Sequence, residues 1–135
     1  MKKFFFPLVV LFIGLANVNF AKAETFQLST HILDISRGTP APDVEIVLYK
    51  KVAENWVLVS SKKTDKNGRI ADFLPQNKDN SGVYKLHFKT EDYFKTQNLP
   101  TIYPFVDVVF KIEGNGHYHI PITMSANGYA TYRGN

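Results

Sequence analysis

The leading candidates for acid–base or electrostatic chemistry come from four separate stretches of the sequence: His31, Arg69, the pair His117 and His119, and Tyr132. A neutral imidazole with a pKa near ~6.5 can take a proton from water at neutral pH. A guanidinium offers a planar fork of donors to oxygen atoms. These residue types suit hydrolysis by general acid–base catalysis without a covalent intermediate.

The sequence lacks the residues that several other catalytic chemistries require. The sequence has no cysteine, which excludes thiol catalysis and disulfide bonds. It also has no Gly-x-Ser-x-Gly nucleophile motif, no phosphate-binding loop and no dinucleotide fingerprint. The histidines are therefore the leading candidates for a catalytic role.

Strand periodicity predicts where the histidines point. A first strand has one inward face, formed by Phe26, Leu28, Thr30 and Ile32. His31 lies on the opposite face of that strand. His117 and His119 are two residues apart in a later strand, so they share a face, while Tyr118 takes the core side. Such outward side chains could meet Arg69 and Tyr132 only in a groove between sheets or between subunits.

Simpler interpretations exist for several histidines and for Arg69. Arg69 alone would be a solvated turn residue, and His117 would be a surface residue at a strand end. His87 shares its strand face with Lys85 and Lys89, so we interpret it as solvated. His117 and His119 could also form half of a metal site, because both imidazoles point one way. No Asp, Glu or Cys lies close enough in sequence to complete that site.

Short apolar segments between turns predict an all-β fold. The expected strands are 26–32, 44–52, 56–60, 70–74, 83–90, 103–112, 118–124 and 129–133. Asp65–Gly68 is a strong turn, because Asn-Gly tolerates positive φ. One helix is expected over 91–98, capped by Thr90. Seven or eight strands and one helix fit an antiparallel β-sandwich.

Some of the expected strands are apolar on both faces. Val44, Ile46 and Leu48 alternate with other apolar residues, and the segment 105–110 does the same. One sandwich buries only one face of each sheet. Ordinary surface hydrophobicity is the alternative, but the second apolar face favours an oligomer.

The net charge of +4 comes mostly from an export segment. Residues 1–23 read as a signal peptide, with a basic start, an apolar run too short to span a membrane, and the small-x-small site Ala21–Ala23. The domain then covers 24–135, with 13 basic and 12 acidic residues, since Lys2, Lys3 and Lys22 leave. We expect an exported, periplasmic protein with neither nucleic acid nor membrane as a partner.

Several motifs, in order, resemble the transthyretin-like 5-hydroxyisourate hydrolases. They are Leu28–Asp34 followed by Gly38–Ala41, Thr64–Arg69, Tyr103–Pro104, His117–Pro121 and the terminal Tyr129–Asn135. The resemblance covers essentially all of 24–135. The terminal Tyr-Arg-Gly is specific, because it separates these hydrolases from the hormone-carrying transthyretins. The family usually ends in serine where this chain has Asn135, so we expect reduced or altered activity at most.

The resemblance implies a fold, an assembly and a reaction. The fold is a transthyretin-like sandwich of about eight strands with one short helix. The assembly is a homotetramer whose dimer–dimer interface forms a channel with the active sites. The reaction is the hydrolytic ring opening of 5-hydroxyisourate, in urate degradation, to 2-oxo-4-hydroxy-4-carboxy-5-ureidoimidazoline, and it needs no metal or other cofactor.

The resemblance also assigns the site residues His31, Arg69, His119 and Tyr132. His31 and His119 would orient and deprotonate the water, with His119 as the preferred base. Arg69 would hold substrate oxygens and stabilise developing negative charge, and Tyr132 would position the ring. The competing hypotheses are a non-catalytic carrier of a small ligand and a metal-dependent enzyme or metal carrier that uses His117 and His119.

Overall fold

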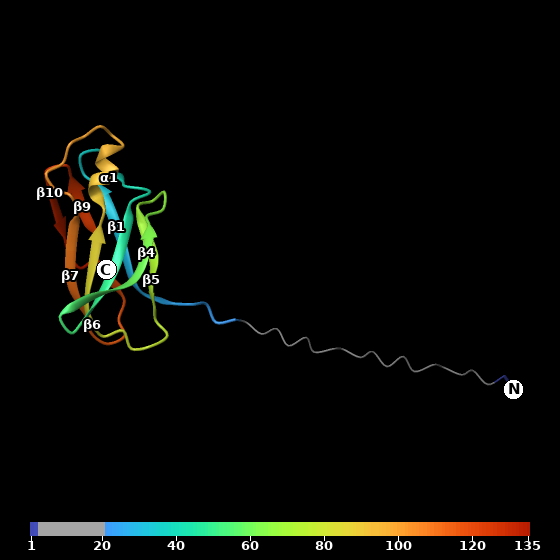
Figure 1. Ribbon diagram of the computed structural model, residues 1–135. Coiled ribbons are helices and arrows are strands. Elements are labelled where there is room, and N and C mark those ends of the chain that lie inside the picture. The colour runs from blue at the N-terminus through green and yellow to red at the C-terminus, as the bar shows by residue number, and fades with distance from the viewer. Residues whose placement is uncertain (3–20) are drawn as a thin grey trace.

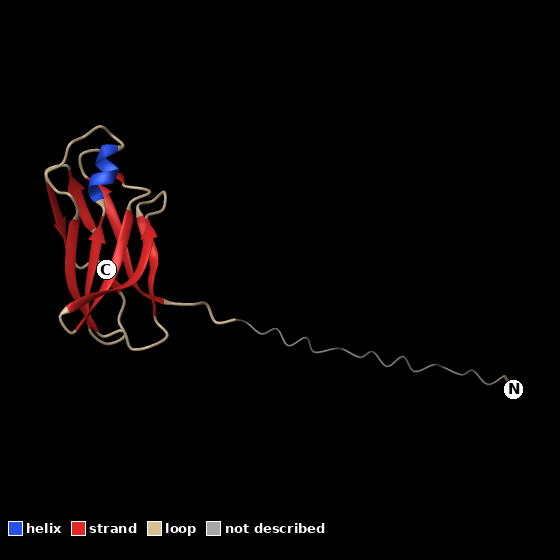
Figure 2. Ribbon diagram, viewed as in Figure 1, coloured by secondary structure: helices blue, strands red, loops and turns tan. Residues whose placement is uncertain are grey.

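The computed structural model describes residues 1–2 and 21–135. The expected signal peptide, 1–23, therefore lies outside the described residues except at its ends. Residues 26–134 form two β-sheets packed face to face, with a short helix at one end of the sandwich (Figure 1). Strands make up most of the domain (Figure 2), which confirms the predicted all-β sandwich.

The first sheet is built around one central strand. Its members are β1 (Phe26–Asp34), β2 (Thr39–Pro40), β5 (Arg69–Pro75), β8 (Tyr118–His119), β9 (Ile122–Ser125) and β10 (Gly128–Thr131). β1 pairs antiparallel with β2 and β5 but parallel with β8 and β9. This parallel pairing was not predicted, and it brings residues about 90 positions apart in sequence to one place.

One predicted strand, 118–124, is divided in the structure. β8 and β9 are separated at Pro121, because proline has no backbone N–H to continue the ladder. The short strand β2, between the expected strands 26–32 and 44–52, was not predicted.

The second sheet has the order β4-β3-β6-β7 and is antiparallel throughout. Its strands are β3 (Glu45–Val52), β4 (Asn55–Lys63), β6 (Gly82–Phe88) and β7 (Val106–Ile112). β7 begins three residues later than predicted, after Pro104. β4 is longer than predicted at both ends because its whole length pairs with β3.

The core lies between the two sheets. The alternating residues of β1 are fully buried from Leu28 onward, together with side chains of the facing sheet: Ile46, Leu48, Leu86, Phe88 and Ile112. Burying each such side chain contributes ~1.5–3 kcal/mol to folding. The inward face predicted for the first strand is confirmed, and His31 lies on the other face.

The helix α1 (Thr90–Lys95) is shorter than predicted. The predicted cap is wrong: Lys89 holds the cap position, and the hydroxyl of Thr90 is buried inside the first turn without a hydrogen-bond partner. The chain after Lys95 continues in tight turns, with Gln97 N donating to Phe94 O. Among the described residues, no helix has the length and apolarity that a membrane crossing requires.

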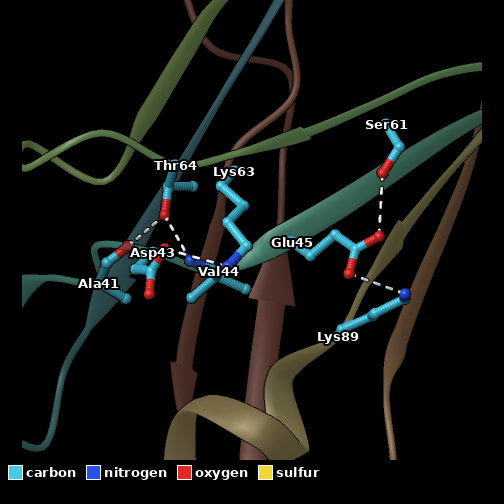
Figure 3. A network of polar contacts seen from close by, with 8 residues as sticks. All are labelled: Ala41, Asp43, Val44, Glu45, Ser61, Lys63, Thr64 and Lys89. Atoms are coloured by element: carbon cyan, nitrogen blue, oxygen red, sulfur yellow. Dashed lines mark hydrogen bonds and ion pairs between the residues drawn. The ribbon is translucent and has the colours of Figure 1, made fainter.

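A polar network joins the ends of β3 and β4 near the helix (Figure 3). The buried Thr64 hydroxyl donates to Ala41 O (2.8 Å) and accepts from Val44 N (2.9 Å). Glu45 accepts from Ser61 and pairs with Lys89. Thr64 directly follows β4 and precedes the Asp65–Gly68 turn, so this network anchors the end of β4, from which the turn leads to Arg69 at the start of β5.

Candidate functional site

His31 and Arg69 lie side by side on neighbouring strands. They are direct partners in the β1–β5 register, so both side chains project from the outer face of the first sheet. His31 is half-buried and Arg69 is exposed. The structure therefore brings together two residues that are 38 positions apart in sequence.

The turn before Arg69 is held by backbone and side-chain bonds. Asp65 Oδ1 accepts from Asn67 N (2.8 Å) and Arg69 N (2.9 Å). Gly68 has φ +70°, and a Cβ there would lie 2.7 Å from the carbonyl oxygen of Ile32. Only glycine fits this close approach, which confirms the predicted turn and fixes Arg69 against β1.

The other two histidines meet at a serine. Ser29 Oγ lies 2.8 Å from His119 Nδ1 and 2.9 Å from His117 Nε2. Ser29 is the register partner of His119 in the parallel β1–β8 pair, and Ile120 N donates to Ser29 O. Since Ser29 and His31 are two apart in β1, they share the outer face. The face thus carries a row that runs from Arg69 through His31 to His119.

The chain end packs against His119. Gly134 N donates to His119 O at 2.8 Å, and a Cβ on Gly134 would lie 2.5 Å from His119 Cδ2. The neighbouring Arg133 guanidinium stacks over the Tyr118 ring, 4.4 Å from its centre. Gly134 therefore lies directly against the His119 ring, and Arg133 lies against the neighbouring Tyr118.

The electrostatics of the row favour neutral imidazoles. Burial, followed by the positive charge of Arg69, lowers the pKa of His31. Burial also lowers the pKa of His119, with further contributions from Arg69, His31 and His117. A neutral imidazole beside a fixed guanidinium can accept a proton while the guanidinium binds an oxygen anion.

Tyr132 takes a different position in the protomer. It is 57% exposed and lines a surface pocket together with Val109 and Phe110 of β7. Within residues 21–135, no hydrogen bond joins Tyr132 to His31 or His119. The structure thus brings together three of the four predicted site residues, and the role of Tyr132 stays a prediction.

The remaining histidine interpretations can now be judged by contacts. The Ser29-facing nitrogens of His117 and His119 are engaged as described, and no group of three or more metal-binding side chains occurs in the described part of the chain. His87 is not simply solvated, contrary to its interpretation. Its Nδ1 lies 2.6 Å from Asp107 Oδ1, and its ring lies against Phe105.

Comparison with known proteins shows which family the chain belongs to. The model of the HIUase/Transthyretin family matches residues 28–134. The chain belongs to this family. Family relatives include the 5-hydroxyisourate hydrolase of Salmonella typhimurium, 38% identical over 135 residues and covering 99% of each chain. The hydrolase of Salmonella dublin is 44% identical over 108 residues, 79% of each chain.

Solved structures of the family share the fold. Transthyretin from Sparus aurata matches with a TM-score of 0.75 and 31% identity, over 79% of this chain and 95% of that one. The 5-hydroxyisourate hydrolase of Klebsiella pneumoniae matches with a TM-score of 0.70 and 34% identity, over 80% and 98%. Both confirm the transthyretin-like sandwich.

Two residues at the site were missed by sequence reasoning. Ser29 is two residues from His31 in the same strand, so the sequence already places both on one face. The parallel register with β8, which brings Ser29 to His119, could not be read from the sequence. Gly134 belongs to the terminal Tyr-Arg-Gly motif, but nothing in the sequence explains why a glycine is needed at this position. The approach of the His119 ring supplies that reason.

Proposed function

We propose that this protein is an enzyme that hydrolyses 5-hydroxyisourate. The observation that carries the proposal is the row of two half-buried imidazoles and one guanidinium on the outer face of the first sheet. A carrier of apolar ligands needs no such row. The family relatives named 5-hydroxyisourate hydrolase support the same activity.

In the proposed reaction, His119 accepts a proton from water as the water oxygen bonds to a ring carbonyl carbon. The tetrahedral intermediate then collapses and the ring C–N bond breaks. The proton passes from His119 to the leaving nitrogen, so the histidine returns to its neutral form. A positioned base of this kind contributes ~10²–10⁴ in rate.

Arg69 binds the carbonyl oxygen on which negative charge develops, because its donors lie on the face that carries His31 and His119. His31 orients the attacking water. Tyr132 positions the substrate ring, and its place at the β7 side of the protomer fits a site completed at a subunit contact.

We further propose a homotetramer. β7 and β10 are edge strands of their sheets, and apolar side chains stand exposed on or beside them: Phe105, Val109, Tyr129 and Tyr132. Edge strands with exposed apolar residues are typical of surfaces that pair with another chain. Sedimentation would test the assembly, and a monomer at micromolar concentration would contradict it.

Export to the periplasm is a separate part of the proposal and rests on the pattern of residues 1–23. The mass of the protein recovered from a periplasmic extract tests it. Cleavage after Ala23 is expected, whereas a protein of full length in the cytoplasm would contradict export.

The activity itself is tested by ultraviolet absorbance of freshly generated 5-hydroxyisourate. The purified protein should accelerate the decay of the substrate over buffer alone. A decay rate equal to that in buffer, with folded protein present, would contradict the proposed function.

A further inference from the structure

We propose that Ser29 and His117 are positioning residues that hold His119 in the tautomer with its proton on Nδ1. Nε2 of His119 is then bare and ready to accept the proton of the attacking water. The inference rests on the proposed function and adds two residues to it. It is carried by a chain of three hydrogen bonds whose direction is fixed at one end.

The fixed end is a backbone carbonyl. His117 Nδ1 lies 3.0 Å from Phe26 O, and a carbonyl oxygen can only accept. His117 Nδ1 must therefore carry the proton. In neutral His117, the other nitrogen, Nε2, is then an acceptor.

The serine hydroxyl carries the direction of hydrogen bonding from His117 to His119. Ser29 Oγ lies 2.9 Å from His117 Nε2, so the hydroxyl donates its single proton there. The same oxygen lies 2.8 Å from His119 Nδ1 and can now only accept from it. His119 Nδ1 therefore carries a proton, and its Nε2 carries the lone pair.

The opposite direction is less favourable on this face. It would require a second proton on His117, because Nδ1 must keep its own for Phe26 O. His31, His117 and Arg69 are already coupled electrostatically to His119. Adding another positive charge to this group of cationic and imidazole side chains costs Coulomb energy.

The backbone holds the chain of bonds in place. Ser29 lies in the middle of β1 and pairs with His119 across the parallel ladder, so the hydroxyl and the ring keep their separation. Gly134 closes the other side of the His119 ring. Within residues 21–135, no hydrogen bond occupies His119 Nε2, which leaves that atom for water.

The tautomer matters because free neutral histidine prefers its proton on Nε2. Without the serine, the His119 ring would mostly present an N–H where the reaction needs a base. The same logic makes the orienting group of a catalytic triad important although it never touches the substrate. Ser29 and His117 thus act through His119.

The first test compares Ser29→Ala with Ser29→Thr in the full-length protein. Ser29→Ala should lower kcat by about 10- to 100-fold, by analogy with the loss of outer partners of metal-ligating histidines, with KM little changed. Ser29→Thr keeps the hydroxyl and should recover most of the lost rate. A wild-type kcat in Ser29→Ala would overturn the proposal.

A second pair separates positioning from simple support of the fold. In His117→Asn the amide N–H can still reach Phe26 O, but the shorter side chain places no acceptor at the position of Nε2 beside Ser29. In His117→Gln the amide oxygen can replace Nε2 as that acceptor. We expect the Gln variant to be the more active of the two, and the reverse order would overturn the proposal.

The direct readout is the ¹⁵N chemical shift of the His119 ring nitrogens, which distinguishes an N–H nitrogen from a bare one. The wild-type protein should show a protonated Nδ1 and a bare Nε2, and Ser29→Ala should lose this preference. An unchanged tautomer in Ser29→Ala would overturn the proposal. Wild-type protein without hydrolase activity but with this tautomer would refute only the proposed function.

Discussion

Two polar networks in this molecule are built from the same kinds of bonds but end differently. At the Thr64 network (Figure 3), the hydroxyl bridges Ala41 O and Val44 N, and both ends are backbone groups. At the Ser29 network, the chain of bonds begins at the Phe26 carbonyl and ends on an imidazole of His119. We call the Thr64 network closed, because it ends on backbone groups that it pairs. We call the Ser29 network open, because it ends on the His119 ring, whose other nitrogen has no partner within residues 21–135.

The difference indicates which of the two networks serves stability and which serves catalysis. A closed network satisfies buried polar groups and fixes strand ends, which contributes to stability. An open network leaves one acceptor unpaired at the surface of a rigid sheet, where it can react. Removing a member of each should therefore affect different properties.

The largest expected effect is on the open network. His119→Ala removes the proposed base and should lower kcat by ~10²–10⁴, with little change in the free energy of unfolding, since the ring is only half-buried. Steady-state kinetics and urea unfolding measure both quantities. His87→Ala is the matched control, because it removes an outward histidine of the other sheet. It should keep wild-type turnover as long as sedimentation shows the wild-type assembly, since the His87 ring lies against Phe105 of the proposed subunit surface.

A smaller effect is expected where the chain end supports the ring. In Gly134→Ala the new Cβ would fall 2.5 Å from His119 Cδ2, so the ring must move. A displacement of about 1 Å costs up to ~10² in rate, and we expect kcat to fall by about 10- to 100-fold. Gly116→Ala, where the added Cβ meets open space, is the control. Equal kcat in both variants would show that the contact is unimportant.

The closed network should respond in stability instead. Thr64→Val keeps the shape of the side chain but leaves buried backbone groups of Ala41 and Val44 unpaired. The expected loss is ~1–3 kcal/mol in the free energy of unfolding, measured by urea denaturation. Ser61→Ala removes a nearby exposed hydroxyl that donates to Glu45 and should change stability by less than about 0.5 kcal/mol. A larger loss in Ser61→Ala than in Thr64→Val would contradict this order.

The smallest expected effect is a shift in pH dependence. The pKa values of His31 and His119 are lowered from 6.5, so both stay neutral to lower pH than ordinary histidines. The acid limb of kcat/KM should therefore lie below pH 6.5. Because the unfolded chain binds these protons more readily, stability should also fall as pH drops through this range. An acid limb above pH 6.5 would contradict the pKa direction.

Sequence patterns were sufficient for the faces of strands and for the tight turn. Alternation placed His31 outward and Leu28 inward, because each strand buries only one face. The Asn-Gly pair marked the turn before Arg69, where the backbone needs positive φ. These are local properties of the sequence, and the structure confirms both predictions.

The partners across strands could not be predicted in the same way. That Ser29 lies beside His119 depends on a parallel register between β1 and β8, which no local pattern encodes. The predicted Thr90 cap was wrong because Thr90 is already the first residue of the helix, with Lys89 at the cap position and the Thr90 hydroxyl buried without a partner. The family resemblance, rather than periodicity, selected His119 over His117, and the contacts now give each a different task.

The most direct test of this contrast is the rate of 5-hydroxyisourate decay per folded molecule for Thr64→Val and His119→Ala, measured side by side. We predict a near wild-type rate for Thr64→Val and loss of most of the acceleration for His119→Ala. A His119→Ala protein that hydrolyses the substrate as fast as the wild type would contradict the assignment of the chemistry to the open network.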